Sequence, residues 1–236
     1  MSGALVTGSA RGIGRALALA LAEDAHDVVV HYRSSRDEAE VVAELAKASG
    51  VRAFVVQADV SDPESAAELV DEAERLTGGL RVLVNNVGNY HNGPLDELAV
   101  ETWHEMFASN LHATFYTCRR VVPFMRAAGG GRIINLGYAG AEQLIARPGI
   151  AAYAIAKTGV ILYSKSLAKV EAVHGITVNV ISPGVMENSL AKPRREIPMD
   201  RLGRLDELVA AARYLISDEA GYVTGVTLEV AGGWNV

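Results

Sequence analysis

The stretch TGSARGIG, residues 7–14, separates a short apolar run from a longer segment with helical periodicity. Its glycines Gly8, Gly12 and Gly14 permit a tight turn, let backbone amides approach a pyrophosphate, and bring the following helix against a sheet. The N-terminal end of that helix favours negative charge. The stretch therefore predicts a strand, a turn and a helix arranged to bind a dinucleotide, although a tight turn without a ligand has the same composition.

Strand-like and helix-like segments alternate along the rest of the chain. The runs rich in Val, Ile and Leu are residues 4–7, 27–32, 52–57, 81–85, 132–136, 177–181 and 226–230. Helical patterns cover residues 12–23, 36–48, 63–76, 111–125, 153–173 and 207–216. Near-continuous apolar strands alternating with helices are typical of a parallel sheet covered on both faces. The order predicts an α/β class, doubly wound Rossmann fold.

Composition limits the possible partners. A chain of 236 residues with 50% hydrophobic residues is expected to form one domain over residues 1–236. The net charge is −6 and the 22 Lys and Arg are dispersed, which argues against a nucleic-acid or anionic membrane surface. The longest apolar run, residues 16–22, is far below the ~18 residues of a membrane span. The start reads directly into a strand, so we expect a cytoplasmic protein.

Cysteine and histidine usage argues against two other kinds of site. Cys118 is the only cysteine, which excludes an internal disulfide and favours a buried packing role. The six histidines lack the spacing of a helical metal site. We expect no metal.

Further motifs follow the glycine turn in a fixed order. They are NNVG at residues 85–88, Asn110 after FAS, YAIAK at residues 153–157, and SPGV at residues 182–185. In order and spacing, over nearly the whole chain, they resemble the short-chain dehydrogenases/reductases, most closely the 3-oxoacyl-[acyl-carrier-protein] reductases and less closely the pteridine reductases. The resemblance implies a sheet of about seven strands, a nicotinamide cofactor across the strand ends, and a homo-oligomer, either a tetramer or a dimer.

The residues themselves favour NADP(H) over NAD(H). An acid at the end of the second strand would bind the adenosine ribose and repel a 2′-phosphate, but residues 31–35 contain none. Arg33 and Arg11 can instead form charge-assisted bonds to that phosphate. By resemblance, the cofactor contacts are Gly8, Arg11, Gly12, Ile13, Gly14, Arg33, Ser34, Asp59, Val60, Asn86, Val87, Gly88, Tyr153, Lys157, Pro183, Gly184 and Val185.

Tyr153 and Lys157 are four residues apart on a predicted helix, so their side chains share one face. An ammonium group close to a phenol stabilises the phenolate and lowers its pKa from ~10. The resemblance implies that Tyr153 protonates a substrate carbonyl, that Lys157 also holds the nicotinamide ribose, and that Asn110 positions a water that joins Lys157 to solvent.

Tyr138 departs from the resemblance. Aligned without gaps, it occupies the position of a serine that donates a hydrogen bond to the substrate carbonyl, and losing such a donor lowers turnover by ~10² to 10³. We expect Tyr138 to face the substrate, with its ring as a pocket wall and its hydroxyl as a donor.

Three functions remain open. The first is reduction of a small carbonyl substrate, with a 3-oxoacyl thioester as the default. The second is a pteridine-type reductase, suggested by Tyr138 and by Tyr90. Tyr90 lies where pteridine reductases have an aromatic side chain that stacks on a flat substrate ring. The third is an NADP-binding module with little turnover.

Two segments carry expectations about assembly and access. The helices predicted at residues 111–125 and 153–173 have apolar and small side chains on more than one face, which favours packing against a second subunit. Residues 183–203 are rich in Pro, Arg and Lys and predict a mobile loop over the site.

Overall fold

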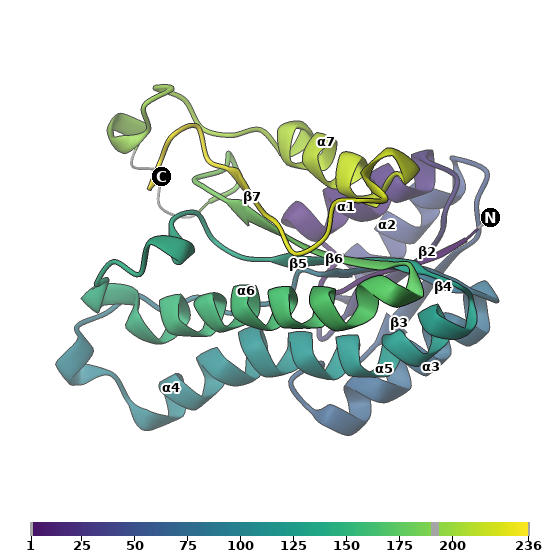
Figure 1. Cartoon of the computed structure of the whole chain (residues 1–236), viewed down its shortest axis with the longest axis horizontal. Helices are drawn as coiled ribbons and strands as arrows, with labels where there is room; N and C mark the ends of the chain where they lie inside the picture. The colour runs from purple at the N-terminus through teal and green to yellow at the C-terminus, as the bar shows by residue number, and fades with distance from the viewer. Residues whose placement is uncertain (1, 190–193, 236) are drawn as a thin grey trace.

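The computed structural model describes residues 2–189 and 194–235. Its centre is a seven-stranded sheet in the order β3-β2-β1-β4-β5-β6-β7, with every neighbouring pair parallel (Figure 1). The strands are β1 (Gly3–Val6), β2 (Asp27–Tyr32), β3 (Ala53–Gln57), β4 (Leu80–Asn85), β5 (Gly131–Leu136), β6 (Ile176–Pro183) and β7 (Thr227–Val230). The predicted fold class is confirmed.

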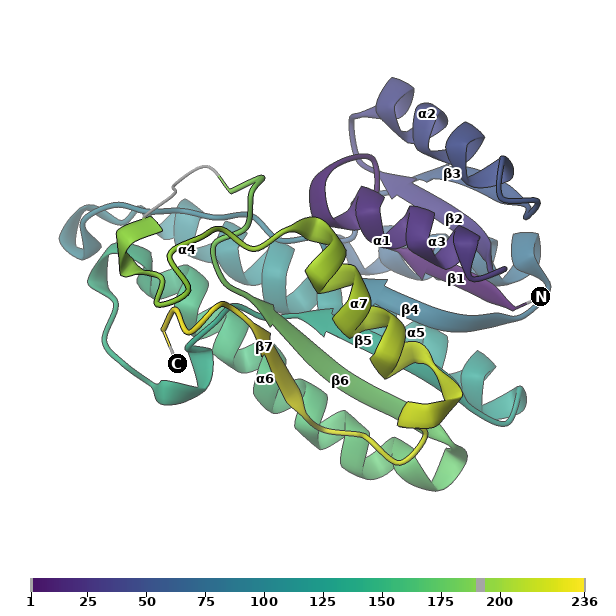
Figure 2. The ribbon, with the colours of Figure 1, turned by 90° about the horizontal axis from the view of Figure 1, so that it is seen from above.

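Helices cover both faces of the sheet (Figure 2). On one face lie α1 (Gly12–Glu23), α2 (Arg36–Lys47) and α7 (Leu205–Ile216). On the other face lie α3 (Pro63–Thr77), α5 (Ala113–Ala127) and α6 (Ala151–Glu171). Short 3-10 turns occur at Leu95–Glu97, Ala141–Gln143, Pro148–Ile150, Ala172–His174, Arg194–Glu196 and Asp218–Ala220. Because both faces are covered, β1 and β2 are buried along their whole length, which explains their continuous apolar sequence.

The strand order reverses at β1, which lies between β2 and β4. The chain runs from β1 outward to β3, then returns and continues from β4 to β7 in the opposite direction. In open α/β sheets, ligands bind at the carboxyl ends of the strands where this reversal occurs. The glycine turn follows β1, and residues 86–88 follow β4, so both predicted segments lie at this point.

One predicted helix begins later than expected, and one helix was not predicted. The helix expected to begin at residue 111 is α5, which begins at Ala113 and is preceded by a π-helical segment, Ala108–His112. Before it lies α4 (Val100–Phe107), which the sequence reading missed. Val100, Trp103 and Phe107 have helical spacing, but only Met106 of this short helix is buried, so the apolar signal was weak.

The predicted mobile loop, residues 183–203, is anchored where it is described; residues 190–193 lie outside the described residues. Met186 pairs with Gly203 in an isolated parallel bridge. Ile197 is buried, and the amide of Met199 donates to the carbonyl of Gly232 at 3.1 Å. Within the described ranges, none of the helices combines the length and apolarity required to cross a bilayer.

Candidate active site

The turn between β1 and α1 depends on glycine. Gly8 and Gly12 have φ values of +63° and +58°, in the left-handed region that favours glycine. A Cβ atom on Gly14 would lie 2.4 Å from the carbonyl oxygen of Gly8, so a side chain there would push the helix away from the turn. The turn and the first turn of α1 therefore lie close together, as the sequence predicts.

The segments after β1 and β4 are hydrogen-bonded to each other. The Thr7 hydroxyl oxygen accepts from the amides of Asn86 at 3.0 Å and Val87 at 3.2 Å. In return, the Asn86 side-chain amide donates to the carbonyls of Thr7 and Gly8 at 3.0 and 3.1 Å. The turn thus positions Asn86 through its backbone amide and its side-chain NH2 group, and Val87 and Gly88 follow it along the edge of the cavity.

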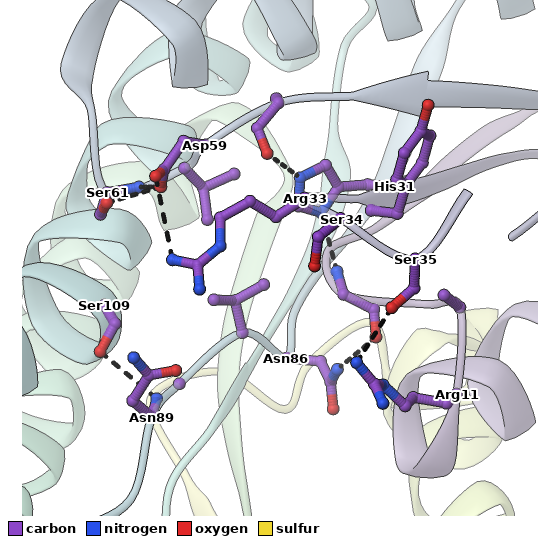
Figure 3. Close-up of a pocket in the computed structure, with 17 residues that line it drawn as sticks. Arg11, His31, Arg33, Ser34, Ser35, Asp59, Ser61, Asn86, Asn89 and Ser109 are labelled. Carbon is purple, nitrogen blue, oxygen red and sulfur yellow. Dashed lines mark hydrogen bonds and ion pairs between the residues drawn. The ribbon is translucent and has the colours of Figure 1, made fainter. Parts of the chain in front are cut away.

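A cavity of about 340 Å³ opens beside the glycine turn (Figure 3). Most of the predicted cofactor contacts line it, namely Gly8, Arg11, Arg33, Ser34, Asp59, Val60, Asn86, Val87 and Gly88. These residues come from the ends of β1, β2, β3 and β4, so the structure brings together segments that are far apart in the sequence. The cavity lies at the end of the predicted site that would hold the adenosine.

The cavity has cations on the side of β2. Arg11 donates from Nη2 to the Ser35 hydroxyl at 2.9 Å, and Arg33 extends across the cavity, with Nη1 3.9 Å from the Asp59 carboxylate. Figure 3 shows both guanidinium groups directed into the space between the walls. The Ser61 hydroxyl, which donates to Asp59, is the main cause that lowers the pKa of this carboxyl. Residues 31–35 supply hydroxyls and a guanidinium rather than an acid, which fits a phosphorylated ribose.

Three predicted residues meet at the other end of the site. A Cβ atom on Gly88 would lie 2.3 Å from Oδ1 of Asn110 and 3.3 Å from Nζ of Lys157. Lys157 is buried and donates from Nζ to the carbonyl of Leu136 at 2.7 Å. Burial lowers the pKa of Lys157 to about 8. The absence of a side chain at Gly88 is what allows Asn110 and Lys157 to approach each other.

Asn110 lies in the π-helical segment between α4 and α5, a geometry that often occurs at functional sites. Its side-chain amide donates to the carbonyls of Asn89 at 2.9 Å and Met106 at 3.0 Å. Its Oδ1 is buried and has no hydrogen-bond partner among the described residues. A buried acceptor without a partner fits the water that the sequence reading placed between Asn110 and Lys157.

Tyr153 lies between two other tyrosines. The ring of Tyr90 meets it edge-on with centroids 5.0 Å apart and an interplanar angle of 79°, and the Tyr138 ring lies 5.5 Å away at 52°. Lys157 Nζ is 5.9 Å from the centroid of the Tyr153 ring. Burial is the main cause that raises the pKa of Tyr153 above its usual value. That Lys157 lowers this pKa stays a prediction, and burial acts in the opposite direction.

Tyr138 lies next to Tyr153, as its position in the sequence predicts. It is only 7% exposed, and the guanidinium carbon of Arg147 lies 5.9 Å from its ring centroid. Burial raises the pKa of Tyr138, while the charge of Arg147 opposes the shift. The ring also lines an apolar cavity between Leu144 and α6. Tyr138 thus contacts Tyr153 and also lines this apolar cavity.

The remaining predicted contacts lie outside the adenosine cavity. Pro183 ends β6, and its carbonyl accepts from the amide of Ala139 at 3.1 Å, which places it beside the Tyr138 loop. Gly184 packs closely on Ala231, and Val185 is buried. The side chain of Ile13 packs against the core, which leaves its backbone amide at the start of α1 for a ligand.

Several residues that line the adenosine cavity are not among the predicted contacts, and His31 and Ser35 are two of them. Ser35 could have been found from its position directly after Arg33 and Ser34. His31 interrupts the apolar run of its strand, but the sequence does not show which partners a polar side chain there would reach.

The site contains hydrogen-bond donors and cations that suit a nucleotide, and a tyrosine close to a buried lysine. Across residues 2–189 and 194–235, no group of three His, Cys, Asp or Glu side chains could hold a metal ion. A doubly wound sheet with a glycine turn at the strand reversal, a cationic ribose pocket and a tyrosine–lysine pair defines the class of dinucleotide-dependent oxidoreductases.

Comparison with known proteins leads to the same class. A family profile described as enoyl-(acyl carrier protein) reductase matches residues 8–235. The 3-oxoacyl-[acyl-carrier-protein] reductase FabG of Staphylococcus aureus is 38% identical over 98% of this chain and 96% of its own length. The 3beta-hydroxysteroid dehydrogenase 1 of Eggerthella lenta is 37% identical over 97% and 92%. A short-chain dehydrogenase of Burkholderia cenocepacia, solved in complex with NADP, has a TM-score of 0.94 and 31% identity, covering 100% of this chain and 98% of that one. The chain belongs to the short-chain dehydrogenase/reductase family of oxidoreductases.

Proposed function

We propose that this protein is an NADP(H)-dependent reductase of a carbonyl compound, with a 3-oxoacyl thioester as the default substrate and Tyr153 as the proton donor. The observation that carries the proposal is the convergence of Asn110, Lys157 and Tyr153. Gly88, which lies beside Asn110 and Lys157, also lines the cavity that contains Arg11 and Arg33. A protein that only bound the nucleotide would not need Asn110, Lys157 and Tyr153 together.

Each residue of the site has a separate role in the proposed reaction. When bound, NADPH supplies the hydride that reaches the carbonyl carbon. Tyr153 gives its hydroxyl proton to the carbonyl oxygen, which becomes the alcohol. Lys157, fixed by its hydrogen bond to Leu136, holds positive charge near the phenolate that remains. The free acceptor Oδ1 of Asn110 binds a water that returns a proton to this end of the site.

The substrate class rests on the relatives. FabG of Staphylococcus aureus is by name a 3-oxoacyl-[acyl-carrier-protein] reductase, while the relative from Eggerthella lenta is by name a dehydrogenase of a hydroxysteroid. One observation favours a second candidate, a pteridine-type reductase of a planar ring: Tyr90 is 56% exposed and lies edge-on against Tyr153, where it could contact a flat substrate.

The test is NADPH consumption with acetoacetyl thioesters, aliphatic aldehydes, quinones and dihydropterins. We expect the highest kcat/KM with an acetoacetyl thioester. A preference for dihydropterin would replace the lead with the second candidate, and NADPH binding without turnover on any of these substrates would support a binding module.

Cofactor choice depends on the two arginines of the adenosine cavity. NADPH is expected to bind at least about ten-fold more tightly than NADH, or about 1.4 kcal/mol, because Arg11 and Arg33 can pair with the additional phosphate. Arg33→Ala should remove most of this preference by weakening NADPH and not NADH. Fluorescence titration with NADPH and with NADH measures the difference in affinity. The control is Arg36→Ala, which removes an exposed arginine that pairs with Glu40. Equal affinity of the parent for both nucleotides would contradict the assignment.

We also propose that the protein is a homo-oligomer, a tetramer or a dimer. Support comes from apolar side chains that are exposed on α5, on α6 and in the loop before α6, namely Phe115, Leu144, Ile145, Ile155 and Leu162. Exposed apolar patches of this kind mark interaction surfaces. Light scattering at micromolar concentration should give at least twice the mass of one chain, and Leu162→Glu should lower it. A monomeric parent would count against this proposal.

Two further proposals concern the chain as a whole. We propose that residues 1–236 act as one domain, so limited proteolysis should leave no stable fragment. We also propose a cytoplasmic location, which cell fractionation tests.

A further inference from the structure

One buried histidine connects two walls of the adenosine cavity. His31 lies near the end of β2 and is 1% exposed. Its Nδ1 is 2.8 Å from the amide nitrogen of Gly8, and its Nε2 is 3.1 Å from the carbonyl oxygen of Ala58. Figure 3 shows the ring between the glycine turn and the segment that leads to Asp59.

The two partners fix the protonation of the ring. The Gly8 amide can only donate, so Nδ1 must be the acceptor, and the Ala58 carbonyl can only accept, so Nε2 must carry the hydrogen. The imidazole is therefore neutral and held as one tautomer. Burial lowers the pKa of His31 to about 4, which keeps this arrangement at neutral pH.

Each contact acts on a part of the cavity wall. Gly8 is the first glycine of the turn, and its positive φ sets the direction in which the rest of the turn leaves β1. The backbone of His31 adds to this, because its carbonyl accepts from the Ser9 amide at 2.9 Å and its amide donates to the Ser9 hydroxyl at 3.0 Å. Ala58 directly precedes Asp59 and Val60 on the opposite wall.

A packing role alone would not require a histidine. On the same face of β2, Val29 is fully buried among apolar side chains, and an apolar residue at position 31 would continue that pattern. Burying an imidazole is unfavourable unless both ring nitrogens have partners. Here both partners, Gly8 and Ala58, line the adenosine cavity.

We propose that His31 is a positioning residue for the nucleotide: through Gly8 and Ala58 it holds the glycine turn and the Asp59 segment at the separation that the adenosine half of the cofactor requires. This inference rests on the proposed function, since it assumes that NADP(H) occupies the cavity. His31 acts through its two backbone partners and takes no part in proton transfer at Tyr153.

The test compares substitutions that remove one or both hydrogen bonds. His31→Leu removes both at similar volume. His31→Asn keeps a polar atom near the position of Nδ1, and His31→Gln keeps one near the position of Nε2. Val29→Ala is the matched control, because it weakens the core under the same strand without touching the turn. Each variant is assayed for its NADPH dissociation constant, kcat at saturating NADPH, and melting temperature.

In His31→Leu we expect the NADPH dissociation constant to rise about ten-fold or more, because the Gly8 amide loses its buried partner. Its kcat at saturating NADPH should stay within about two-fold of the parent, since the chemistry at Tyr153 is unchanged. His31→Asn should restore most of the affinity, and His31→Gln should restore less. Val29→Ala should lower the melting temperature without changing the dissociation constant.

Three outcomes would overturn the inference. One is His31→Leu binding NADPH as the parent does. Another is Val29→Ala weakening binding as much as His31→Leu, which would reduce His31 to a general contribution to stability. If His31→Leu does not fold, the inference depends on the difference between the amide variants, and a His31→Gln variant that binds NADPH as tightly as the parent would exclude it. A parent that binds neither NADPH nor NADH would instead contradict the proposed function, and this inference with it.

Discussion

Replacing Tyr153 with phenylalanine is expected to lower turnover by ~10² or more while NADPH binding is retained. The phenylalanine keeps the ring between Tyr90 and Tyr138 and removes only the hydroxyl that donates the proton. Stopped-flow or steady-state NADPH oxidation with the best substrate measures turnover, and fluorescence titration measures binding.

The matched control is Tyr163→Phe. Tyr163 lies on the same helix, α6, and packs edge-on against Phe115, with ring centroids 5.7 Å apart. This variant should keep turnover within about two-fold of the parent, because it removes a hydroxyl from α6 that takes no part in the proposed proton transfer. Unimpaired turnover in Tyr153→Phe would remove Tyr153 from the mechanism, and a loss of NADPH binding would show that the substitution disturbed the site itself.

Tyr138→Phe is expected to lower turnover by ~10² or more if the Tyr138 hydroxyl holds the substrate carbonyl. The ring position is fixed by burial and by contact with Tyr153, so the substitution should leave the pocket shape unchanged. The charge of Arg147, which lies against the ring, opposes the rise in the pKa of Tyr138 that burial causes. The measurement is kcat and KM for the preferred substrate.

Tyr138→Ser distinguishes the role of the hydroxyl as a hydrogen-bond donor from the role of the ring as a wall of the pocket. The shorter side chain restores the donor that the family resemblance implies and opens a passage toward the apolar cavity beside α6. Activity on simple acetoacetyl thioesters should rise, and activity on the preferred substrate should fall. If both variants behave like the parent on every accepted substrate, another group holds the carbonyl and Tyr138 is only part of the core.

Much of the fold follows directly from the sequence because its signals are local. The glycine turn and the apolar runs at β1 and β2 indicate parallel strands that are covered on both faces. The position of β1 between β2 and β4 follows from the resemblance rather than from local pattern. Helix α4 was missed because it buries a single residue, Met106, so its amphipathic signal was weak.

The candidate site was predictable only in part, for a different reason. Motif residues such as Tyr153, Lys157 and Asn110 carry their chemistry in their identity and spacing. His31 could not be found in this way, because its proposed role depends on Gly8 and Ala58, which follow two other strands, β1 and β3. The raised pKa of Tyr153 is likewise a product of burial between Tyr90 and Tyr138, and sequence spacing does not report burial.

The central place of β1 has a consequence for how the protein is made. During synthesis, residues 1–57 can pair β1, β2 and β3, but one edge of β1 stays open until β4, residues 80–85, has left the ribosome. The far end of the nucleotide groove is completed later still, when α6 brings in Tyr153 and Lys157. We therefore expect nucleotide to stabilise the early half-sheet less than the finished chain. Truncated chains that end before α6 should gain little protection from proteolysis when NADPH is added.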